Sequence, residues 1–254
     1  MKFSLHIDTH AHLYDCFNLE MWVRHALKNL SVSDVVQGIV VVVDREGQSS
    51  FERLRREVPT FADWKEHTIS EELRTGVISL DGQDLIVIPG VQYISAERLE
   101  VLALGTIRTI PDGHALLDLI EHILSQQATV CLPWSPGKWL GRRGAHIRNV
   151  LNRYCAADLC LGDISVHAQS WPKSRILNQY TSQGFKCLVG TDALERPNDC
   201  SLVGSYGIIC EVEGAVPAAD VISVIRRLPV DRTTVWGAPN GLVTAIERFI
   251  SSLL

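Results

Sequence analysis

Two histidines and one aspartate, each close to the end of a predicted strand, are the side chains of this sequence best placed to bind a metal ion. The first predicted strand runs into His10 and His12, and a later strand, 186–189, is followed closely by Asp192. Because side chains alternate along a strand, His10 and His12 point to one side, and Asp8 points the same way, where it could orient an imidazole ring. Two imidazoles and a carboxylate form a three-ligand set that leaves a divalent ion open to water.

The same pattern has less specific interpretations, which the sequence leaves open. His-x-His arises easily by chance in a polar loop, and Asp192 suits a solvated turn or a helix cap equally well. We predict at most one divalent ion, held by His10, His12 and Asp192, or no metal if these histidines have lost their role. Imidazole ligands favour zinc, manganese or iron over magnesium. His167, after the predicted strand 159–164, is a further candidate metal ligand, with a surface-loop position as the alternative.

Three basic side chains are candidates for binding an anionic substrate. Arg45 follows a buried strand, and Lys138 and Arg142 lie in a loop rich in tryptophan, glycine and basic residues. A guanidinium stays charged and binds anions bidentately, so Arg45 is predicted to contact the substrate and to act in catalysis together with Asp192. Two alternatives stay open: Arg45 forms a fixed ion pair with Asp44 or Asp192, and the basic loop is only solvated.

These residues must be positioned by short β-branched runs that alternate with amphipathic helical stretches. The predicted strands are 5–8, 35–43, 69–80, 85–88, 99–104, 129–132, 159–164, 186–189 and 207–212. The predicted helices are 18–30, 49–56, 112–127, 145–154, 174–183, 218–227 and 241–253. This alternation indicates an α/β fold, a single TIM-like, distorted β/α barrel of seven or eight mostly parallel strands. Without a linker-like segment, 1–254 is predicted to be one domain, with a hairpin insertion around 69–91.

Composition and charge narrow the classes of partner. The chain of 254 residues carries 24 Lys and Arg against 29 Asp and Glu, a net charge of −5. That balance argues against a dedicated nucleic-acid-binding protein, and no apolar run approaches the roughly 18 residues of a spanning helix. The seven cysteines form no Cys-x-x-Cys pair and are typical of reduced, buried thiols. We therefore expect a small anionic substrate, no membrane and a cytoplasmic location; the sequence offers no evidence for nucleic acid, and no sequence feature indicates an oligomeric state.

Several short blocks follow one another along the chain. They are Asp8-Thr9-His10-Ala11-His12, Val42-Val43-Asp44-Arg45, Ile88-Pro89-Gly90-Val91-Gln92, Glu100 to Gly105, Val130-Cys131-Leu132-Pro133, Gly190-Thr191-Asp192-Ala193-Leu194 and Val203-Gly204. In this order the sequence resembles the polymerase and histidinol phosphatase (PHP) superfamily of metal-dependent phosphoesterases. The resemblance implies a distorted barrel with a metal site at its mouth, to which His10, His12 and Asp192 carry over.

Several positions depart from the ligand pattern of that superfamily. Arg45 stands in place of a histidine, Gln92 of a glutamate, and Leu132 and Leu194 of histidines, and no histidine occurs in 100–105. Arginine and leucine cannot bind a cation, and glutamine is a poor substitute for a carboxylate. The resemblance, with these losses, implies a divergent metal-dependent hydrolase of phosphate esters that uses one divalent ion or none.

Two other functions stay open. A catalytically degenerate PHP-like barrel could serve as a binding or regulatory module, which the lost ligands favour and the retained histidines and aspartate disfavour. An amidohydrolase-type enzyme would need a further histidine on the fifth or sixth strand, a role that His167 alone could fill.

Overall fold

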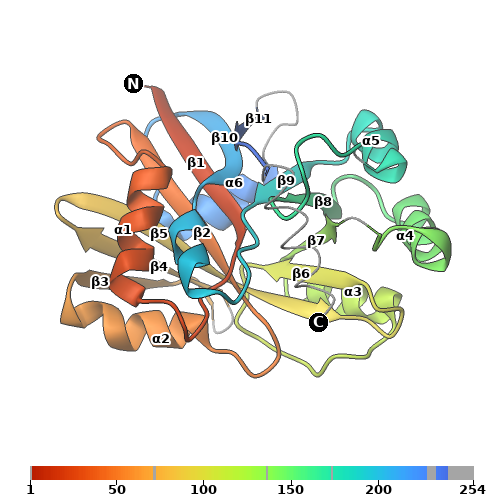
Figure 1. Ribbon diagram of the computed structural model, residues 1–254, viewed down its shortest axis with the longest axis horizontal. Helices are drawn as coiled ribbons and strands as arrows, with labels where there is room; N and C mark the ends of the chain where they lie inside the picture. The colour runs from red at the N-terminus through yellow and green to blue at the C-terminus, as the bar shows by residue number, and fades with distance from the viewer. Residues whose placement is uncertain (1, 71–72, 136, 173, 228–232, 240–254) are drawn as a thin grey trace.

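The computed structural model describes residues 2–70, 73–135, 137–172, 174–227 and 233–239, and Figure 1 shows a curved sheet with helices packed around it. The strands are β1 Lys2–Ala11, β2 Val36–Asp44, β3 Asp63–Thr68, β4 Arg74–Leu80, β5 Gln83–Ile94, β6 Glu100–Leu104, β7 Thr129–Trp134, β8 Leu159–Ile164, β9 Cys187–Gly190, β10 Tyr206–Glu213 and β11 Thr233–Gly237. The helices are α1 Leu19–Asn29, α2 Ser50–Glu57, α3 Leu116–Ser125, α4 Gly141–Arg153, α5 Arg175–Ser182 and α6 Val221–Arg227. The predicted helix at 241–253 lies outside the described residues.

The sheet forms a nearly closed barrel. Its hydrogen-bonded order is β11-β10-β1-β2-β5-β6-β7-β8-β9, and β4, with β3 beside it, branches from β5. The pairs β1–β2, β2–β5, β7–β8 and β8–β9 are parallel, and along this order only β6 and β10 run against the other strands. The predicted distorted barrel of mostly parallel strands is confirmed.

The connections explain where the strand direction reverses. Only 95–99 separate β5 from β6, whereas a parallel crossover needs a dozen or more residues, so these neighbours pair antiparallel. Asp81 and Gly82 join β4 to β5 with positive φ angles of 52° and 78°, as a tight hairpin turn requires. Beyond this turn β5 continues as a barrel strand between β2 and β6. The predicted strands did not include β3 and β11.

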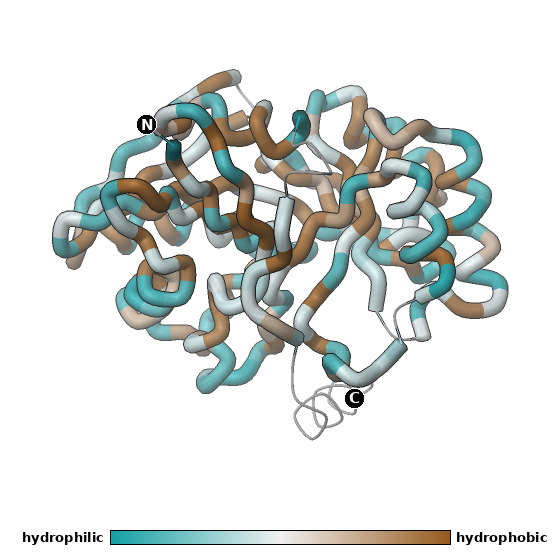
Figure 2. The backbone as a smooth tube through the Cα atoms, turned by 90° about the horizontal axis from the view of Figure 1, so that it is seen from above, coloured by the Kyte–Doolittle hydropathy of each residue, from teal (hydrophilic) through white to brown (hydrophobic). Residues whose placement is uncertain are grey.

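Alternating side chains divide the apolar residues between the barrel interior and an outer layer. In β2, Ile39 and Val41 belong to the interior cluster, while Val40 packs outward in a second cluster with Trp22 of α1. A third cluster lies between α3, α4, α5 and the outer face of β6–β8. Figure 2 shows the corresponding apolar segments concentrated toward the centre of the molecule. This packing makes the barrel a filled core, so polar chemistry is confined to its ends.

A bulge near the end of β1 sets the direction of the two histidines. Leu5 and Ile7 belong to the interior cluster, but Ala11 belongs to the outer one, and the register with β2 shifts between Asp8 and Ala11. An extra residue in a strand reverses the alternation beyond it. The expectation that Asp8 points with the histidines to orient a ring is therefore wrong, because that expectation assumed an uninterrupted strand.

Asp8 instead closes the barrel between β1 and the segment that follows β9. Its buried carboxylate accepts hydrogen bonds from the Thr191 and Gly204 backbone N–H groups, both at 2.9 Å, and from the Thr191 hydroxyl at 2.5 Å. Burial raises the pKa of Asp8, and these donors partly offset that effect. Gly190 permits the close approach, since a Cβ there would lie 2.3 Å from the His10 backbone nitrogen.

The largest differences between predicted and observed helix starts are four residues: α3 begins at Leu116 instead of 112, and α4 begins at Gly141 instead of 145. Asp112, the first residue of the predicted helix 112–127, lies before α3, and its carboxylate accepts from the Ile94 backbone N–H at 2.8 Å. α3 begins at Leu116, whose N–H donates to the carboxylate of Glu97 at 2.9 Å. A carboxylate distant in sequence thus satisfies one of the unpaired N–H groups at the helix start.

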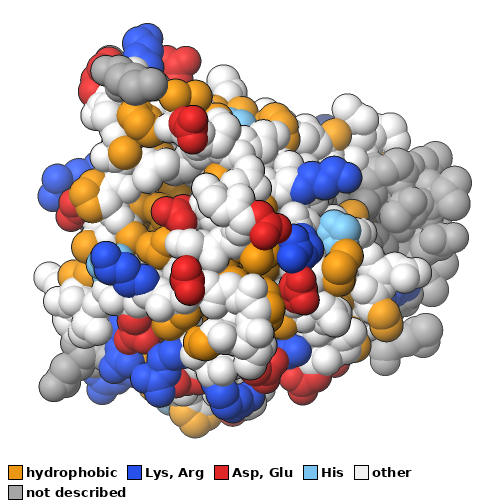
Figure 3. Space-filling view, turned by 90° about the vertical axis from the view of Figure 1, so that its left-hand side faces the viewer, with side chains coloured by type: hydrophobic (Ala, Val, Ile, Leu, Met, Phe, Trp, Pro, Cys, Tyr) orange, Lys and Arg blue, Asp and Glu red, His pale blue; other side chains and the backbone are white. Residues whose placement is uncertain are grey.

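Charged side chains of both signs are interspersed on the face that carries α1, α2 and the β3–β4 hairpin (Figure 3). Arg24 pairs with Glu20 and Asp81 there, and Arg55 pairs with Glu52. Among the described residues, no helix combines the length and the apolar character needed to cross a membrane.

Candidate metal centre

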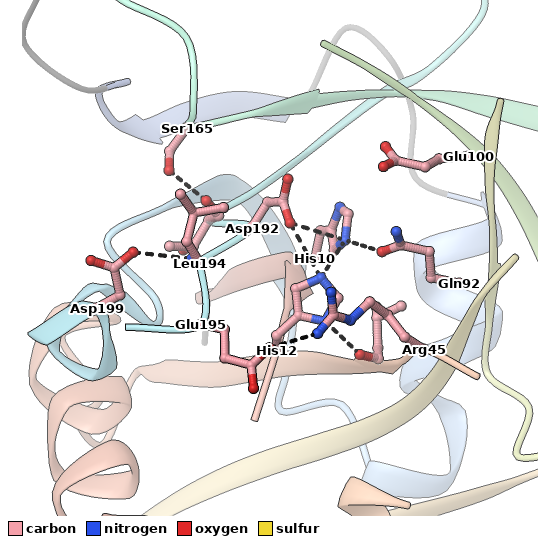
Figure 4. A network of polar contacts seen from close by, with 12 residues as sticks. His10, His12, Arg45, Gln92, Glu100, Ser165, Asp192, Leu194, Glu195 and Asp199 are labelled. Carbon is pink, nitrogen blue, oxygen red and sulfur yellow. Dashed lines mark hydrogen bonds and ion pairs between the residues drawn. The ribbon is translucent and has the colours of Figure 1, made fainter. Parts of the chain in front are cut away.

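The two histidines and the aspartate meet at the mouth of the barrel. His10 and His12 lie at the end of β1, and Asp192 follows β9, the strand that packs against it (Figure 4). The Asp192 N–H donates to the His10 carbonyl at 2.7 Å, and Asp192 has a φ of 47°, in the left-handed region that aspartate tolerates better than most residues. The barrel closure that Asp8 holds thus also fixes the third candidate ligand.

The distances between these ligand atoms match those around a single ion. The Nε2 atoms of His10 and His12 are 3.2 Å apart, and Asp192 Oδ1 lies 3.6 Å and 3.2 Å from them, respectively. Ligands held about 2.0–2.1 Å from a tetrahedral zinc ion stand about 3.4 Å from one another. In the described part of the chain, these three residues form the one group of at least three His, Cys, Asp or Glu side chains with such spacing.

The hydrogen bonds of the rings determine which nitrogen is available. His12 Nδ1 lies 2.8 Å from the Val43 carbonyl, which only accepts, so in a neutral ring Nδ1 carries the proton and Nε2 keeps its lone pair. His10 Nε2 lies 3.3 Å from Gln92 Oε1, while its Nδ1 is buried and found no hydrogen-bond partner within the described part of the chain. One ring is therefore fixed by the backbone and the other by its neighbours at the mouth.

The electrostatics favour the protonation states that a metal requires. Burial lowers the pKa of His10, against an opposing effect of the charge on Asp192. Burial raises the pKa of Asp192, but His10 and His12 more than compensate, and the pKa stays well below its usual range. A neutral imidazole beside an ionised carboxylate is the ligand state that binds a divalent ion. The residues present fit a metal ion.

Arg45 lies at the mouth, but its partner differs from those considered. Its Nη2 is 3.0 Å from Glu195 Oε2, and its guanidinium carbon lies 5.0 Å from the centre of the Tyr14 ring. Asp44, one of the partners considered, accepts the Ser50 N–H at 2.9 Å. The alternative of a fixed pair with Asp44 or with the aspartate of the site is not found, and a solvent-exposed pair with Glu195 takes its place.

The basic loop supplies one residue to the site and leaves another outside it. Lys138 contacts the carboxylate of Glu100, and its charge contributes to the lowered pKa of Asp192. Arg142 is exposed in the first turn of α4, and no described contact joins it to the histidines. The loop is thus more than solvated, but only Lys138 of the two comes near the candidate centre.

His167 belongs to a separate buried cluster. Its Nε2 lies 2.9 Å from Asp163 Oδ1, its Nδ1 lies 3.1 Å from the Ala168 carbonyl, and Tyr206 donates to Asp163 Oδ2 at 3.2 Å. The Trp134 ring lies beside the imidazole, tilted by 57°, with ring centres 5.0 Å apart. The structure therefore does not bring His167 into the three-residue group, and its surface-loop alternative also fails, because the residue is buried.

Sequence reasoning missed three residues at the mouth. The ring centre of Tyr14 lies 5.2 Å from that of His12. Glu100 forms an ion pair with Lys138, and Glu195 forms an ion pair with Arg45. Tyr14 follows the histidine pair closely in the sequence, so its proximity was a usable signal. Glu195 and Glu100 are brought in by tertiary contacts, for which the sequence offers no local pattern.

The positions that depart from the ligand pattern of the PHP superfamily lie at different distances from the candidate centre. Gln92 reaches the site, as described above, with its amide oxygen toward His10. Leu132 packs with the outer cluster under α3–α5, and the Leu194 N–H donates to Asp199 at 3.0 Å. Of these, only the glutamine offers an oxygen atom next to the candidate centre.

No family model and no curated protein matches the sequence, but solved structures share its fold. PsfC from Pseudomonas syringae is 16% identical with a TM-score of 0.58, covering 100% of this chain and 99% of that one. A PHP-like metal-dependent phosphoesterase, predicted as such, within a two-domain protein from Bacteroides vulgatus is 11% identical, with a TM-score of 0.55 over 98% of this chain and 70% of that one. The lesion-specific endonuclease EndoQ from Pyrococcus furiosus is 11% identical, with a TM-score of 0.53 over 93% of this chain and 57% of that one.

These neighbours confirm the predicted resemblance to the PHP superfamily at the level of the fold, at low sequence identity. They include a phosphoesterase predicted to be metal-dependent and a lesion-specific endonuclease. At the mouth of this barrel, the three-residue group is the part of the described chain that could hold a metal ion.

The expectation that set nucleic acid aside is contradicted, and the small anionic substrate stays a prediction. That expectation rested on the net charge of −5, yet endonuclease Q has this fold and was solved in complex with a 27-mer duplex substrate that has an abasic lesion at the active site. Nucleic-acid binding depends on local clusters of basic side chains on the surface. The net charge sums over the whole chain, so it does not reveal such a cluster.

Proposed function

We propose that this protein is a metal-dependent hydrolase of phosphate esters, with one divalent ion held by His10, His12 and Asp192. The observation that carries the proposal is the convergence of two imidazole Nε2 atoms and a carboxylate oxygen within 4.8 Å of one another at the mouth of the barrel. A divalent ion bound there would supply Lewis-acid activation of water and of a phosphoryl oxygen. Zinc, manganese and iron suit this ligand set better than magnesium.

The residues around the candidate centre would bind and orient the phosphoryl group. The Val43 carbonyl holds the His12 ring in one tautomer, and Asp192 is held by its backbone hydrogen bond to β1. Arg45 and Lys138 place two cations at the mouth, suited to charge-assisted hydrogen bonds with phosphoryl oxygens. Glu195 and Glu100 hold these cations in position. Arg142, a predicted substrate-binding residue, has no place in this arrangement.

A degenerate barrel that acts as a binding or regulatory module is the second candidate. The specific observation in its favour is that both cations at the mouth are already neutralised, Arg45 by Glu195 and Lys138 by Glu100. A phosphate ester must compete with these carboxylates for the same donors. The two candidates differ in whether metal is retained and turnover occurs.

Elemental analysis and a hydrolysis assay on the same preparation test the proposal. Protein purified without chelator is expected to hold one zinc, manganese or iron ion per chain and to hydrolyse p-nitrophenyl phosphate or bis(p-nitrophenyl) phosphate. Chelation should abolish turnover, and addition of the same metal should restore it. A protein that holds no metal and hydrolyses neither ester after metal addition would contradict the proposal and favour the binding module.

A further inference from the structure

A groove of about 640 Å³ lies on the side of the barrel that carries α4 and α5, apart from the three-residue group. It is lined by Trp134, Trp139, Leu140 and Trp171. The first two rings are buried and form its floor, whereas Trp171 is half-buried and Leu140 is 70% exposed. The groove therefore presents an aromatic surface to solvent, and its volume is in the range of sites for small organic groups.

The rim of this groove is cationic. Arg148 and Arg175 line it, and Arg142 lies one residue beyond Gly141, another lining residue. All three arginines are exposed, and within the described part of the chain no ion pair includes them. α4 contains no acidic residue, in contrast to α1 and α2, where arginines pair with glutamates of the same helix. A positive strip thus remains available on a chain that is acidic as a whole.

One loop joins the groove to the mouth of the barrel. Its residue Lys138 contacts Glu100 at the mouth, while Trp134 and Trp139, on either side of it in sequence, form the floor of the groove. An extended anionic ligand that follows this loop would meet the cations of the mouth at one end and the aromatic groove at the other.

We propose that the groove between α4 and α5 binds a base of single-stranded nucleic acid, with Trp171 stacking on the base and Arg148, Arg175 and Arg142 contacting the backbone phosphates. Aromatic side chains in a positively charged groove are the combination by which single strands are bound without sequence preference. This inference deepens the proposed function by naming its substrate class. A lipid surface fits less well, because it would need several exposed apolar side chains. Among the described residues that line the groove, only Leu140 is a large apolar side chain that is mostly exposed.

Fluorescence anisotropy with labelled oligothymidylate tests the proposal on the intact chain. A strand of about 12 nucleotides lies within the roughly 4–16 nucleotides that single-strand sites cover, and chelator in the buffer prevents hydrolysis. Binding is expected to weaken steeply between about 50 and 200 mM salt. Trp171→Ala should weaken it about 5- to 150-fold, the range for one stacked base, while Trp171→Phe should retain most of the affinity.

A charge-matched pair of variants separates this groove from general electrostatics. Arg148→Glu/Arg175→Glu should reduce the affinity for the strand at least tenfold, whereas Arg55→Glu/Arg56→Glu on α2, with the same change in net charge, should leave it nearly unchanged. Equal losses in both double variants would overturn the proposal, as would equally tight binding of thymidine monophosphate or of a duplex of the same length. Circular dichroism establishes that each variant is folded.

The outcome stays distinct from that of the hydrolase proposal. The variant His10→Ala/His12→Ala, tested with the same strand, is expected to bind it with unchanged affinity, because the groove does not include the candidate centre. Binding of the strand without hydrolysis of phosphate esters would support the nucleic-acid-binding groove and contradict the hydrolase proposal. Hydrolysis of phosphate esters without binding that depends on Trp171 would support the hydrolase proposal and contradict the groove.

Discussion

Two buried clusters at the ends of barrel strands each combine histidine with aspartate. They differ in which nitrogen and oxygen atoms remain available to bind a ligand. In the cluster of His10, His12 and Asp192, three ligand atoms face one another, and only His12 has its second nitrogen fixed by the backbone. In the cluster of Asp163 and His167, both ring nitrogens and both carboxylate oxygens meet partners. The sequence presents both as candidate ligands.

The difference shows that partner saturation, more than residue type, separates a binding site from a structural contact. His167 has the Ala168 carbonyl beside one ring nitrogen and the Asp163 carboxylate beside the other, so both nitrogens have partners. Tyr206 and the Ile164 N–H complete the contacts of that carboxylate. Such a saturated network contributes to stability and leaves no lone pair for a ligand.

The largest expected effect is the loss of metal when the first cluster is broken. His10→Ala/His12→Ala removes two of three ligands, so the metal content should fall from one ion per chain to none, as measured by elemental analysis. The fold should persist, because neither ring belongs to an apolar cluster and the closure by Asp8 stays in place. The matched control is His114→Ala/His146→Ala at exposed positions, which should retain the ion. Retention of metal by the first variant would refute the assignment.

Breaking the second cluster should instead cost stability. Asp163→Asn replaces a carboxylate oxygen of this buried hydrogen-bond network by an NH2 group, and leaving one buried partner unsatisfied costs about 1–3 kcal/mol. We expect that decrease in the free energy of unfolding from urea denaturation, with the metal content per folded chain unchanged. A variant that unfolds like the wild type but loses its metal would place Asp163 in the metal centre.

An exposed pair offers a third test of the same comparison. Arg45 and Glu195 have side chains that are 44% and 60% exposed, so Arg45→Ala should change the free energy of unfolding by only about 0–1 kcal/mol. If Arg45 binds phosphoryl oxygens, the same variant should weaken inorganic phosphate binding by about 1.5–3 kcal/mol in calorimetry. Glu195→Gln serves as the control that frees the arginine and should not weaken phosphate binding. Unchanged phosphate affinity in Arg45→Ala would reduce the residue to a structural partner.

The sequence predicted the barrel and the three-residue group because both follow from local patterns. The apolar run of β2 and the strand ends at His12 and Asp192 are readable from neighbouring residues alone. The bulge that turns Asp8 away from the histidines was not readable, since it is set by pairing with β2. The partners Glu195 and Glu100 come from distant segments, and the reversal of β6 depends on which strand it pairs with.

The smallest expected effect, a dependence of stability on pH, decides which force dominates in the first cluster. Burial lowers the pKa of His10, and the charge on Asp192 opposes that shift. Because the folded pKa is lowered, the unfolded chain binds more protons below about pH 6.5, so the stabilisation relative to His10→Ala should decrease as the pH falls. The slope for one proton is at most about 1.4 kcal/mol per pH unit.

The comparison between wild type and His10→Ala is made between about pH 5.5 and 7.5. Burial raises the pKa values of Asp8 and Asp44, so their effect on stability has the opposite sign, but these carboxyls titrate mainly below this range and are present in both proteins. The difference in stability between the two proteins therefore reports on the histidine. Urea denaturation of metal-free protein in chelator provides the measurement. If the difference between wild type and His10→Ala grows on acidification, the attraction between a protonated His10 and Asp192 outweighs burial, and the first cluster resembles the saturated pair of the second.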